Sequence, residues 1–288
     1  MFRIAHISDL HLAPLPSIRM REVLNKRLLG YLSWQRQRRY RHRSDVLAKL
    51  RKDVLSYHPD HICITGDLTN IALPKEFEAA TAWLQGLSPP EQVSLIPGNH
   101  DAYVKSAVDL MGEYWPAWIG SGFPYLHKRG PLAIIGLSTA VATWPFMASG
   151  SLGNEQLRKF QAMLEETATA GLKRVVLLHH PPLAGAATWR KSLHDAAAFR
   201  AIIARSGAEL ILHGHCHRPT HGSLPGPAGI VPVYGAGSAS LFSERSGHGA
   251  HYHLFEFKNN DVRVTHRQYD PENFGFTSSR QDELEKVT

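Results

Sequence analysis

The sequence has little cysteine: Cys63 and Cys216 are the only two in 288 residues. Two cysteines exclude a fold organised by a disulfide framework, and a reducing compartment is the default expectation. Long apolar runs are also absent, so no segment is predicted to span a bilayer. The first residues reach a polar motif by His6, too early for the apolar stretch of a secretory signal. We therefore expect a cytoplasmic protein.

Acidic residues are nearly missing from one segment. Between Arg19 and Arg43 the only acid is Glu22, against nine Lys and Arg residues, so this stretch alone carries a net charge of +8. The whole chain has a net charge of +7, which leaves the remainder nearly neutral. One basic patch on a balanced body indicates a single anionic partner surface.

Short apolar runs alternate with helical stretches along most of the chain, which is typical of α/β layering. Three late runs show the period-two alternation of half-buried strands and indicate an antiparallel part. We therefore expect two packed mixed sheets with helices outside. The expected strands cover residues 2–7, 61–65, 93–96, 132–137, 175–178, 210–212, 231–234, 252–257 and 262–266.

No linker, repeat or low-complexity tract divides the chain, so residues 1–270 are predicted to form a single domain. Residues 17–57 form a basic, helical insert in this prediction, with a break near residues 41–44. Residues 271–288 are polar and are expected to form a poorly ordered C-terminal tail.

Five of the expected strands end in a cluster of polar residues. Functional sites in α/β sheets gather beyond the carboxyl ends of the strands. The five clusters are Asp9-Leu10-His11, Gly66-Asp67, Gly98-Asn99-His100-Asp101, His179-His180 and Gly214-His215-Cys216-His217. Carboxylate, amide and imidazole side chains in one place suit Mn, Fe or Zn, so the sequence predicts a metal site at this edge.

Spacing within the clusters supports this prediction. In Asp9-Leu10-His11 a period of two places both polar side chains on one side and Leu10 on the other. The same spacing turns Cys216 away from its two neighbours, so it is not counted as a ligand. Each motif alone is weak, because Asp-x-His and Gly-Asp are common in turns. The complete ordered set is what favours a metal site.

The ordered pattern Asp-x-His, Gly-Asp, Gly-Asn-His-Asp, His-His-Pro-Pro and Gly-His-x-His resembles that of the calcineurin-like metallophosphoesterase superfamily. The resemblance covers residues 4–217, and no ligand position of the pattern is missing. His-His-Pro-Pro and the compact size resemble the bacterial class III cyclic-nucleotide and glycerophosphodiester phosphodiesterases. The resemblance implies a four-layer αββα sandwich that binds two divalent metal ions, either Mn, Fe or Zn.

The resemblance also implies roles for individual residues. The implied metal ligands are Asp9, His11, Asp67, Asn99, His179, His215 and His217. Asp67 would bridge the two ions, with Asp9, His11 and His217 on one of them. His100 would reach the substrate phosphate or the leaving oxygen, and Asp101 would orient His100.

The implied chemistry is metal-assisted hydrolysis. Two cations about 3.5–4 Å apart stabilise both the attacking and the leaving oxygen of an in-line displacement. Metal binding lowers the pKa of water, so hydroxide becomes available near neutral pH to attack phosphorus. A protonated His100 would then neutralise the departing oxygen.

The expected substrate is a phosphodiester in a small or lipid-linked molecule: a cyclic nucleotide, a glycerophosphodiester or a phospholipid headgroup. A nuclease is an alternative, because a basic stripe with aromatics binds nucleic acid. Nuclease relatives, however, carry large capping regions, and only a short sequence follows His215. A phosphomonoesterase is another alternative, since related enzymes of both kinds share His100. A non-catalytic scaffold is disfavoured because no ligand is lost.

Two interpretations of the basic segment 19–43 remain open. It is either a solvated helix face whose arginine stems cover apolar surface, or a contact for anions. Leu24, Leu28 and Leu32 lie at i, i+4 spacing, as in helices that lie at a membrane surface. The second interpretation predicts peripheral contact with the anionic inner membrane or a phospholipid, with nucleic acid less favoured. The candidate substrate or anion contacts are Trp34, Arg36, Arg38 and Arg39.

Several remaining residues are expected to have structural roles. Trp144 and Phe146 could wall a substrate site, but packing in the core is the favoured interpretation. His180 and His213 either support the ligands beside them or are plain structural residues. The other histidines are interpreted as core, surface or sheet positions; they include His6, His61, His251, His253 and His266.

Overall fold

The computed structural model describes residues 1–259 and 261–284, and this part of the chain contains two six-stranded sheets. The first sheet has the spatial order β12 (Gly275–Leu284), β11 (Asp261–Asp270), β10 (His251–Lys258), β1 (Phe2–Ile7), β2 (His61–Ile64) and β3 (Val93–Leu95). Strands β1, β2 and β3 run parallel to one another, whereas β10 and β11 continue the sheet antiparallel. The predicted antiparallel part is therefore confirmed.

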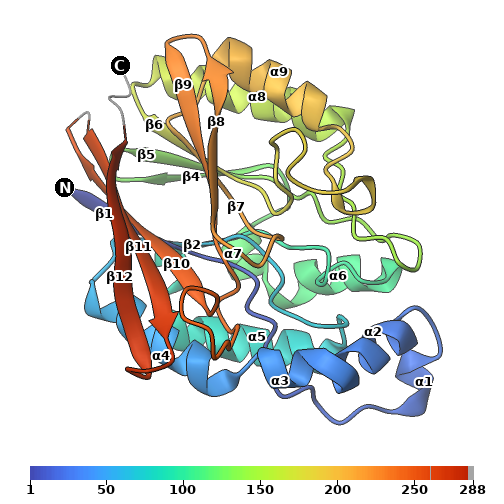
Figure 1. Ribbon diagram of the computed structural model, residues 1–288. Coiled ribbons are helices and arrows are strands. Elements are labelled where there is room, and N and C mark those ends of the chain that lie inside the picture. Colours follow the sequence, from blue (N-terminus) through green and yellow to red (C-terminus); the bar gives the residue numbers. More distant parts are fainter. Residues whose placement is uncertain (260, 285–288) are drawn as a thin grey trace.

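The second sheet packs face to face with the first (Figure 1). Its spatial order is β4 (Tyr125–Arg129), β5 (Leu132–Gly136), β6 (Lys173–Leu177), β7 (Leu210–His213), β9 (Gly229–Gly235) and β8 (Thr220–Gly226). The four central strands are parallel, and β4 and β8 are antiparallel edges. Both sheets are mixed, as predicted.

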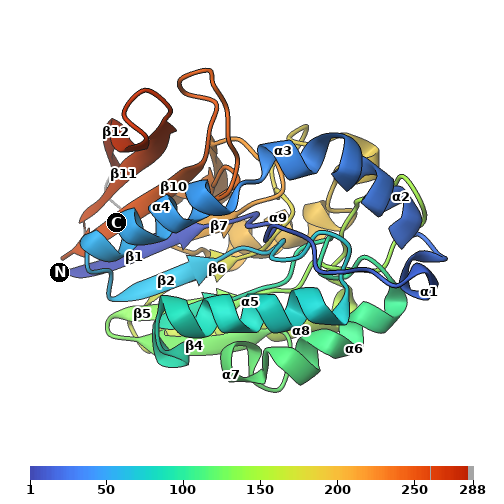
Figure 2. The same cartoon turned by 90° about the horizontal axis from the view of Figure 1, so that it is seen from below.

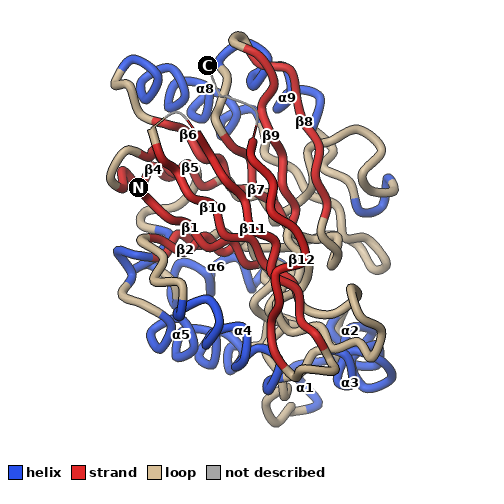
Figure 3. The backbone as a smooth tube through the Cα atoms, turned by 60° about the vertical axis from the view of Figure 1, so that its left-hand side comes forward, coloured by secondary structure: helices blue, strands red, loops and turns tan. Residues whose placement is uncertain are grey.

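Helices cover the two outer faces, which completes the predicted αββα sandwich (Figure 3). The first sheet is covered by α4 (Ser44–Ser56), α5 (Pro74–Leu87), α6 (Lys105–Tyr114) and α7 (Pro116–Ile119), and the second by α8 (Asn154–Thr169) and α9 (Ala196–Ser206). Short 3-10 turns are η2 (Pro90–Gln92) and η3 (Trp189–Lys191). In the described part of the chain, no helix has the length and apolar character that crossing a bilayer requires.

Three hydrophobic cores separate the four layers, and strand alternation distributes side chains between them. In β1, Ala5 and Ile7 point into the core beneath α4 and α5, while Ile4 points into the core between the sheets. The third core lies under α8 and α9, where the rings of Phe160 and Phe199 stack with centroids 5.4 Å apart. Burying both faces of the parallel strands explains their continuous apolar sequences.

The basic insert forms a bent helical arm at one end of the sandwich (Figure 2). It consists of α1 (Met20–Val23), α2 (Arg27–Ser33), the π-helical turn η1 (Trp34–Arg38) and α3 (Arg39–Arg41). The chain becomes extended at His42 before α4 begins, so the predicted break is confirmed. Arg27 ties the arm to the body, because its guanidinium donates to the carbonyls of Ile71 and Ala72 at 2.9 and 2.5 Å.

The interpretation of residues 271–288 as a polar tail was wrong for Gly275–Leu284, which form β12 and pair antiparallel with β11. The connecting turn is closed by Asp270, whose carboxylate accepts from the backbone of Glu272 and the side chain of Asn273. Phe276 anchors the strand, since its ring contacts Tyr252 and Tyr269. An edge strand with one apolar anchor lacks the alternation that identifies strands in sequence. Residues 285–288 lie outside the described residues.

Candidate metal centre

The structure brings all seven predicted metal ligands together beyond the carboxyl ends of β1, β2, β3, β6 and β7. Each ligand lies in the loop that follows its strand, two to four residues after the strand end. Parallel strands deliver these loops to a single edge, as the sequence argument required.

One half of the centre gathers four residues. Nε2 of His217 lies 3.1 Å from Nε2 of His11 and 3.2 Å from Oδ1 of Asp9. Oδ2 of Asp67 lies 3.8 Å from Nε2 of His11. One ligand atom from each of these residues lies within 4.8 Å of the others, so the group could hold a metal ion.

The other half is built on the far side of Asp67. Its Oδ2 lies 3.4 Å from Nε2 of His179. Oδ1 of Asn99 lies 3.2 Å from the same nitrogen and 2.8 Å from Nδ1 of His215. A single Asp67 oxygen therefore faces imidazoles of both halves.

Backbone carbonyls orient the imidazoles for cation binding. Nδ1 of His11 donates to the carbonyl of Thr69 at 3.1 Å, and Nδ1 of His179 donates to that of Thr65 at 2.6 Å. Each bond orients its ring so that Nε2 faces Asp67. Nε2 of His215 is buried without a hydrogen-bond partner. These donors fit a pair of divalent cations.

The charge balance of the centre also favours cations. Burial opposes ionisation of Asp67, but the neighbouring imidazoles of His179 and His100 hold its pKa well below the ordinary value. Burial would likewise lower the pKa of His179, yet the carboxylates of Asp67 and Asp9 raise it to about 9. A buried position that attracts a proton this strongly is one where positive charge is stabilised.

Five of the ligands have left-handed backbone conformations. Positive φ angles occur at Asp9 (52°), His11 (41°), Asp67 (56°), His215 (69°) and His217 (52°). Such conformations are uncommon outside glycine and cluster at functional sites. The prediction that Asp9 and His11 share one side is confirmed, but not through strand alternation, since the strand ends before Asp9.

Asp101 has a different role from the one predicted. Its carboxylate accepts from the backbone amides of Asp67, Thr69 and Gly98, each at 2.9 Å. The predicted contact with the ring of His100 is wrong, because Nδ1 of His100 donates to the carbonyl of another loop residue at 2.6 Å, that of Asn70. Leaving a buried amide unpaired costs about 1–3 kcal/mol. Asp101 therefore holds the loop that carries Asp67.

His100 is anchored to the insert. A guanidinium nitrogen of Arg38 donates to its Nε2 at 2.6 Å. Burial and the nearby Arg38 lower the pKa of His100 to about 3, so the ring is neutral at neutral pH. A protonated His100 stays a prediction for the metal-bound centre. The cation at this position is Arg38.

The other candidates in the insert do not reach the centre. Arg36 and Arg39 are exposed, and the guanidinium of Arg39 donates to Gln35 and stacks on the ring of Tyr40. Trp34 is 9% exposed and belongs to the packing of the insert. Of the four predicted anion contacts, the structure brings Arg38 to His100, beside the predicted metal ligands.

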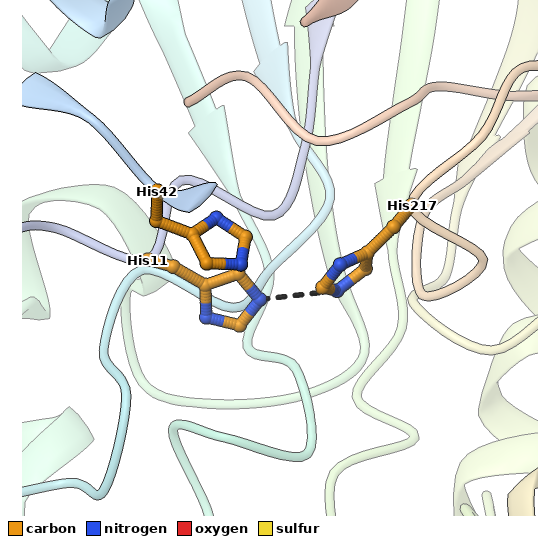
Figure 4. Close-up of side chains that lie close together, drawn as sticks. All are labelled: His11, His42 and His217. Carbon is orange, nitrogen blue, oxygen red and sulfur yellow. Dashed lines mark hydrogen bonds between the residues drawn. The ribbon is translucent and has the colours of Figure 1, made fainter. Parts of the chain in front are cut away.

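His42 joins the centre without having been predicted (Figure 4). It is 4% exposed, and its ring lies 4.6 Å from that of His11 and 5.6 Å from that of His217, between centroids. Its Nδ1 lies 2.9 Å from the Ser240 hydroxyl, which orients the ring. Burial and His217 lower the pKa of His42 to about 2, so it is a neutral donor. Arg-His-Arg in a basic helix gives no sequence signal for this position.

A pocket of about 410 Å³ lies beside Asn99 and His100, between the insert and the loop around Phe146. Lys26, Arg38 and Lys191 contribute positive charge to it. Its lining residues are Lys26, Leu29, Gly30, Ser33, Arg38, Asn99, His100, Tyr103, Phe146, Met147, Ala148 and Lys191. A positive wall combined with apolar side chains suits an anion that carries an apolar group.

Hydrogen bonds hold the two sides of this pocket in place. Nζ of Lys26 donates to the carbonyl and hydroxyl of Thr143 at 3.0 and 2.9 Å. His180 supports the same loop through its contacts with Thr139 Oγ1 and the Ala148 carbonyl. The loop does not pack in the core as expected, since Trp144 is 83% and Phe146 is 79% exposed.

Comparison with known proteins identifies relatives at two levels. The calcineurin-like phosphoesterase family model matches residues 2–219. Glycerophosphodiester phosphodiesterase GpdQ from Enterobacter lignolyticus (strain SCF1) is 32% identical over 187 residues, which represent 62% of this chain and 57% of that protein. The chain thus spans little more than half the length of this curated relative.

Two solved structures share the fold. A dimetal phosphatase from Danio rerio matches with a TM-score of 0.66 at 13% identity, over 96% of this chain and 98% of that chain. Purple acid phosphatase PPD1 from yellow lupin (Lupinus luteus) seeds matches with a TM-score of 0.63 at 12% identity, over 98% of this chain and 53% of that chain. At these identities the likeness concerns the fold alone.

Proposed function

The chain belongs to the calcineurin-like phosphoesterase family, and from this premise we propose that it is a dinuclear-metal-dependent phosphodiesterase acting on a lipid-linked phosphodiester. The observation that carries the proposal is the position of Asp67, whose Oδ2 faces His11 on one side and His179 on the other. One carboxylate between two sets of metal-binding side chains is the arrangement that a pair of ions requires.

The residues present fit two ions. Asp9, His11, Asp67 and His217 would hold the first, and Asp67, Asn99, His179 and His215 the second. When bound, the ions supply the positive charge and the acidity toward water that phosphodiester hydrolysis needs near neutral pH. The donor set suits Mn, Fe and Zn.

The chain's own residues bind and orient the phosphodiester. Arg38 has five N–H donors in a planar fork, which matches two oxygens of one phosphate. His100 holds this fork in place, because its Nε2 accepts from the guanidinium while Nδ1 is fixed by Asn70. In this mechanism Arg38 stabilises charge on the phosphate, and His100 positions it.

The pocket beside the centre supports a substrate with an apolar group. Lys26 and Lys191 suit a second negative charge, and Leu29, Phe146 and Met147 suit a hydrocarbon portion. The relative GpdQ, a glycerophosphodiester phosphodiesterase, supports diester rather than monoester chemistry. Both observations favour a phospholipid-like diester.

Exposed apolar side chains around the pocket support peripheral membrane contact. Trp144 and Phe146 are 83% and 79% exposed, and Trp189, two residues from the pocket residue Lys191, is 70% exposed. On the insert, Leu24 is 73% exposed among basic residues. Large exposed aromatics beside positive charge are typical of surfaces that enter the interface of an anionic bilayer.

The test of the proposed reaction compares two chromogenic esters on protein that has been stripped of metal and refilled with Mn²⁺. We expect faster hydrolysis of bis(p-nitrophenyl) phosphate than of p-nitrophenyl phosphate. Preference for the monoester would replace the proposal with a phosphatase. Failure to hydrolyse either ester, with two metal equivalents bound, would count against this enzymatic function.

The membrane contact is tested with Trp144→Ser combined with Phe146→Ser. The affinity for vesicles containing anionic phospholipid, measured by co-sedimentation, should fall about tenfold or more. The reason is that burying one such aromatic ring contributes about 1.5–3 kcal/mol. The matched control combines Ile230→Ser and Phe274→Ser, which remove apolar side chains that are 57% and 69% exposed elsewhere. Equal vesicle binding by the two double variants would refute the membrane contact.

A further inference from the structure

A second histidine cluster lies in the first sheet. His251 and His253 are two residues apart in β10 and point to the same face, and His253 lies directly opposite His266 of β11. Their ring centroids are 4.5 Å apart for His251 and His253 and 4.9 Å apart for His253 and His266. One ring nitrogen from each lies within 4.8 Å of the others.

This cluster faces the core between the two sheets. The same face of β10 carries Phe255 in that core, and the ring of Tyr234 from the opposite sheet contacts both His253 and His266. His6 of β1 pairs with His253 in register and stacks on it with centroids 5.6 Å apart. Imidazoles thus replace aliphatic side chains in a layer that is otherwise apolar.

Three ring nitrogens of His251 and His253 are buried without hydrogen-bond partners. His253 is fully buried, and neither of its ring nitrogens has a hydrogen-bond partner. Nε2 of His251, which is 1% exposed, has none either. A buried polar group without a partner costs free energy and points to a bound species that satisfies it. Burial lowers the pKa of both rings, to about 3 for His251, so they are neutral and offer lone pairs.

We propose that His251, His253 and His266 form a third cation site, distinct from the dinuclear centre, for Zn²⁺ or a similar borderline divalent ion. Three imidazoles are a donor set that zinc prefers, with water as the fourth ligand. Zinc–nitrogen bonds of about 2.0–2.1 Å place tetrahedral ligand nitrogens about 3.3–3.4 Å apart, so a modest rotation of the rings closes the site. His266 is partly exposed and gives the ion access.

Coordination requires one small rearrangement. The amide of Gly237 approaches Nδ1 of His251 at 3.4 Å, a long hydrogen bond. Binding a cation through Nε2 of His251 transfers the ring proton to Nδ1 and breaks this contact. The bound ion links β10 to β11, and β10 pairs with β1, the strand that precedes Asp9. The site therefore has a stabilising role in the first sheet.

The experiment counts zinc in the full chain by mass spectrometry, after loading with Zn²⁺ and removal of free metal. Wild type should hold one equivalent more than His266→Gln and one more than His251→Gln. The matched control is His61→Gln, which removes a buried imidazole from β2 whose ring bonds to Ser94, outside the cluster. It should keep the wild-type zinc content. Equal zinc in wild type and both cluster variants would overturn the proposal.

A second measurement does not depend on how the variants fold. Crystals of wild type loaded with Zn²⁺ should show an anomalous zinc peak among the three imidazoles. Peaks at the dinuclear centre alone would overturn the third site. Hydrolysis of bis(p-nitrophenyl) phosphate by His266→Gln should stay within about twofold of wild type, because this residue lies outside the machinery of the proposed reaction. If the protein does not hydrolyse phosphodiesters, the expected difference in zinc content between wild type and the cluster variants is unchanged. The third cation site and the phosphodiesterase function can therefore be refuted separately.

Discussion

The Asp67→Asn variant is expected to hydrolyse bis(p-nitrophenyl) phosphate at least about 10³-fold more slowly than wild type. Asp67 supplies the oxygen that faces both His11 and His179, so its charge is shared by both halves of the centre. Asparagine removes that charge with little change in size. Initial rates at saturating Mn²⁺ and metal content by mass spectrometry are the two measurements, and at least one metal equivalent should be lost.

The control for this variant is Asp53→Asn. Asp53 is a partly buried carboxylate outside the centre, paired with Arg267 at 2.7 Å and bonded by the hydroxyl of Tyr252. Its replacement shows how much the loss of a partly buried carboxylate outside the centre changes the hydrolysis rate. That rate should stay within about twofold of wild type. A full rate and a full metal complement in Asp67→Asn would contradict the dinuclear centre.

Replacing Arg38 with alanine should lower kcat/KM for the diester about 10²-fold, the usual effect of removing one preorganised donor to a charged reacting group. The guanidinium reaches the centre only because the π-helical turn and α3 place it over His100. Arg38→Lys should recover little, since an ammonium cannot bind two phosphate oxygens in a fork. Steady-state kinetics on metal-loaded protein provide the measurement.

The neighbouring Arg39 is a close control. It lies on the same helical arm and carries the same charge, but it is exposed and directed toward Gln35 and Tyr40. Arg39→Ala therefore changes the net charge equally without touching the centre. Equal losses in the Arg38 and Arg39 variants would mean that the insert acts through its overall charge rather than through one positioned side chain.

The sequence predicted those parts of the fold and the site that follow from local patterns, namely apolar strands and the polar clusters at their ends. Parallel strands must be continuous apolar runs because both faces are buried, and their ends must meet at one edge. These two constraints predicted α/β layering and the convergence of Asp9, Asp67 and His179 from separate loops, and the family resemblance implied the four-layer αββα arrangement. Neither constraint depends on how distant surfaces pack.

The features that the sequence did not predict depend on tertiary contacts. His42 reaches the centre through the path of the insert, which is set by tertiary contacts such as that of Arg27 with Ile71. The role of Asp101 was wrong because three backbone amides compete for its carboxylate. The edge strands β4, β8 and β12 were missed because an edge needs only one apolar face. All three kinds of information lie outside a local window of sequence.

The left-handed backbone at the metal ligands limits how this centre can change during evolution. Outside glycine, Asn, Asp and His tolerate positive φ better than most residue types, and these same types supply its metal donors. A substitution at Asp9, Asp67 or His217 by most other residues therefore loses a donor and strains the loop together. Substitution at these positions is disfavoured both by the loss of a metal donor and by the strain of a positive φ angle. The exchanges that remain open run among aspartate, asparagine and histidine, so new metal preferences could arise without rebuilding the loops.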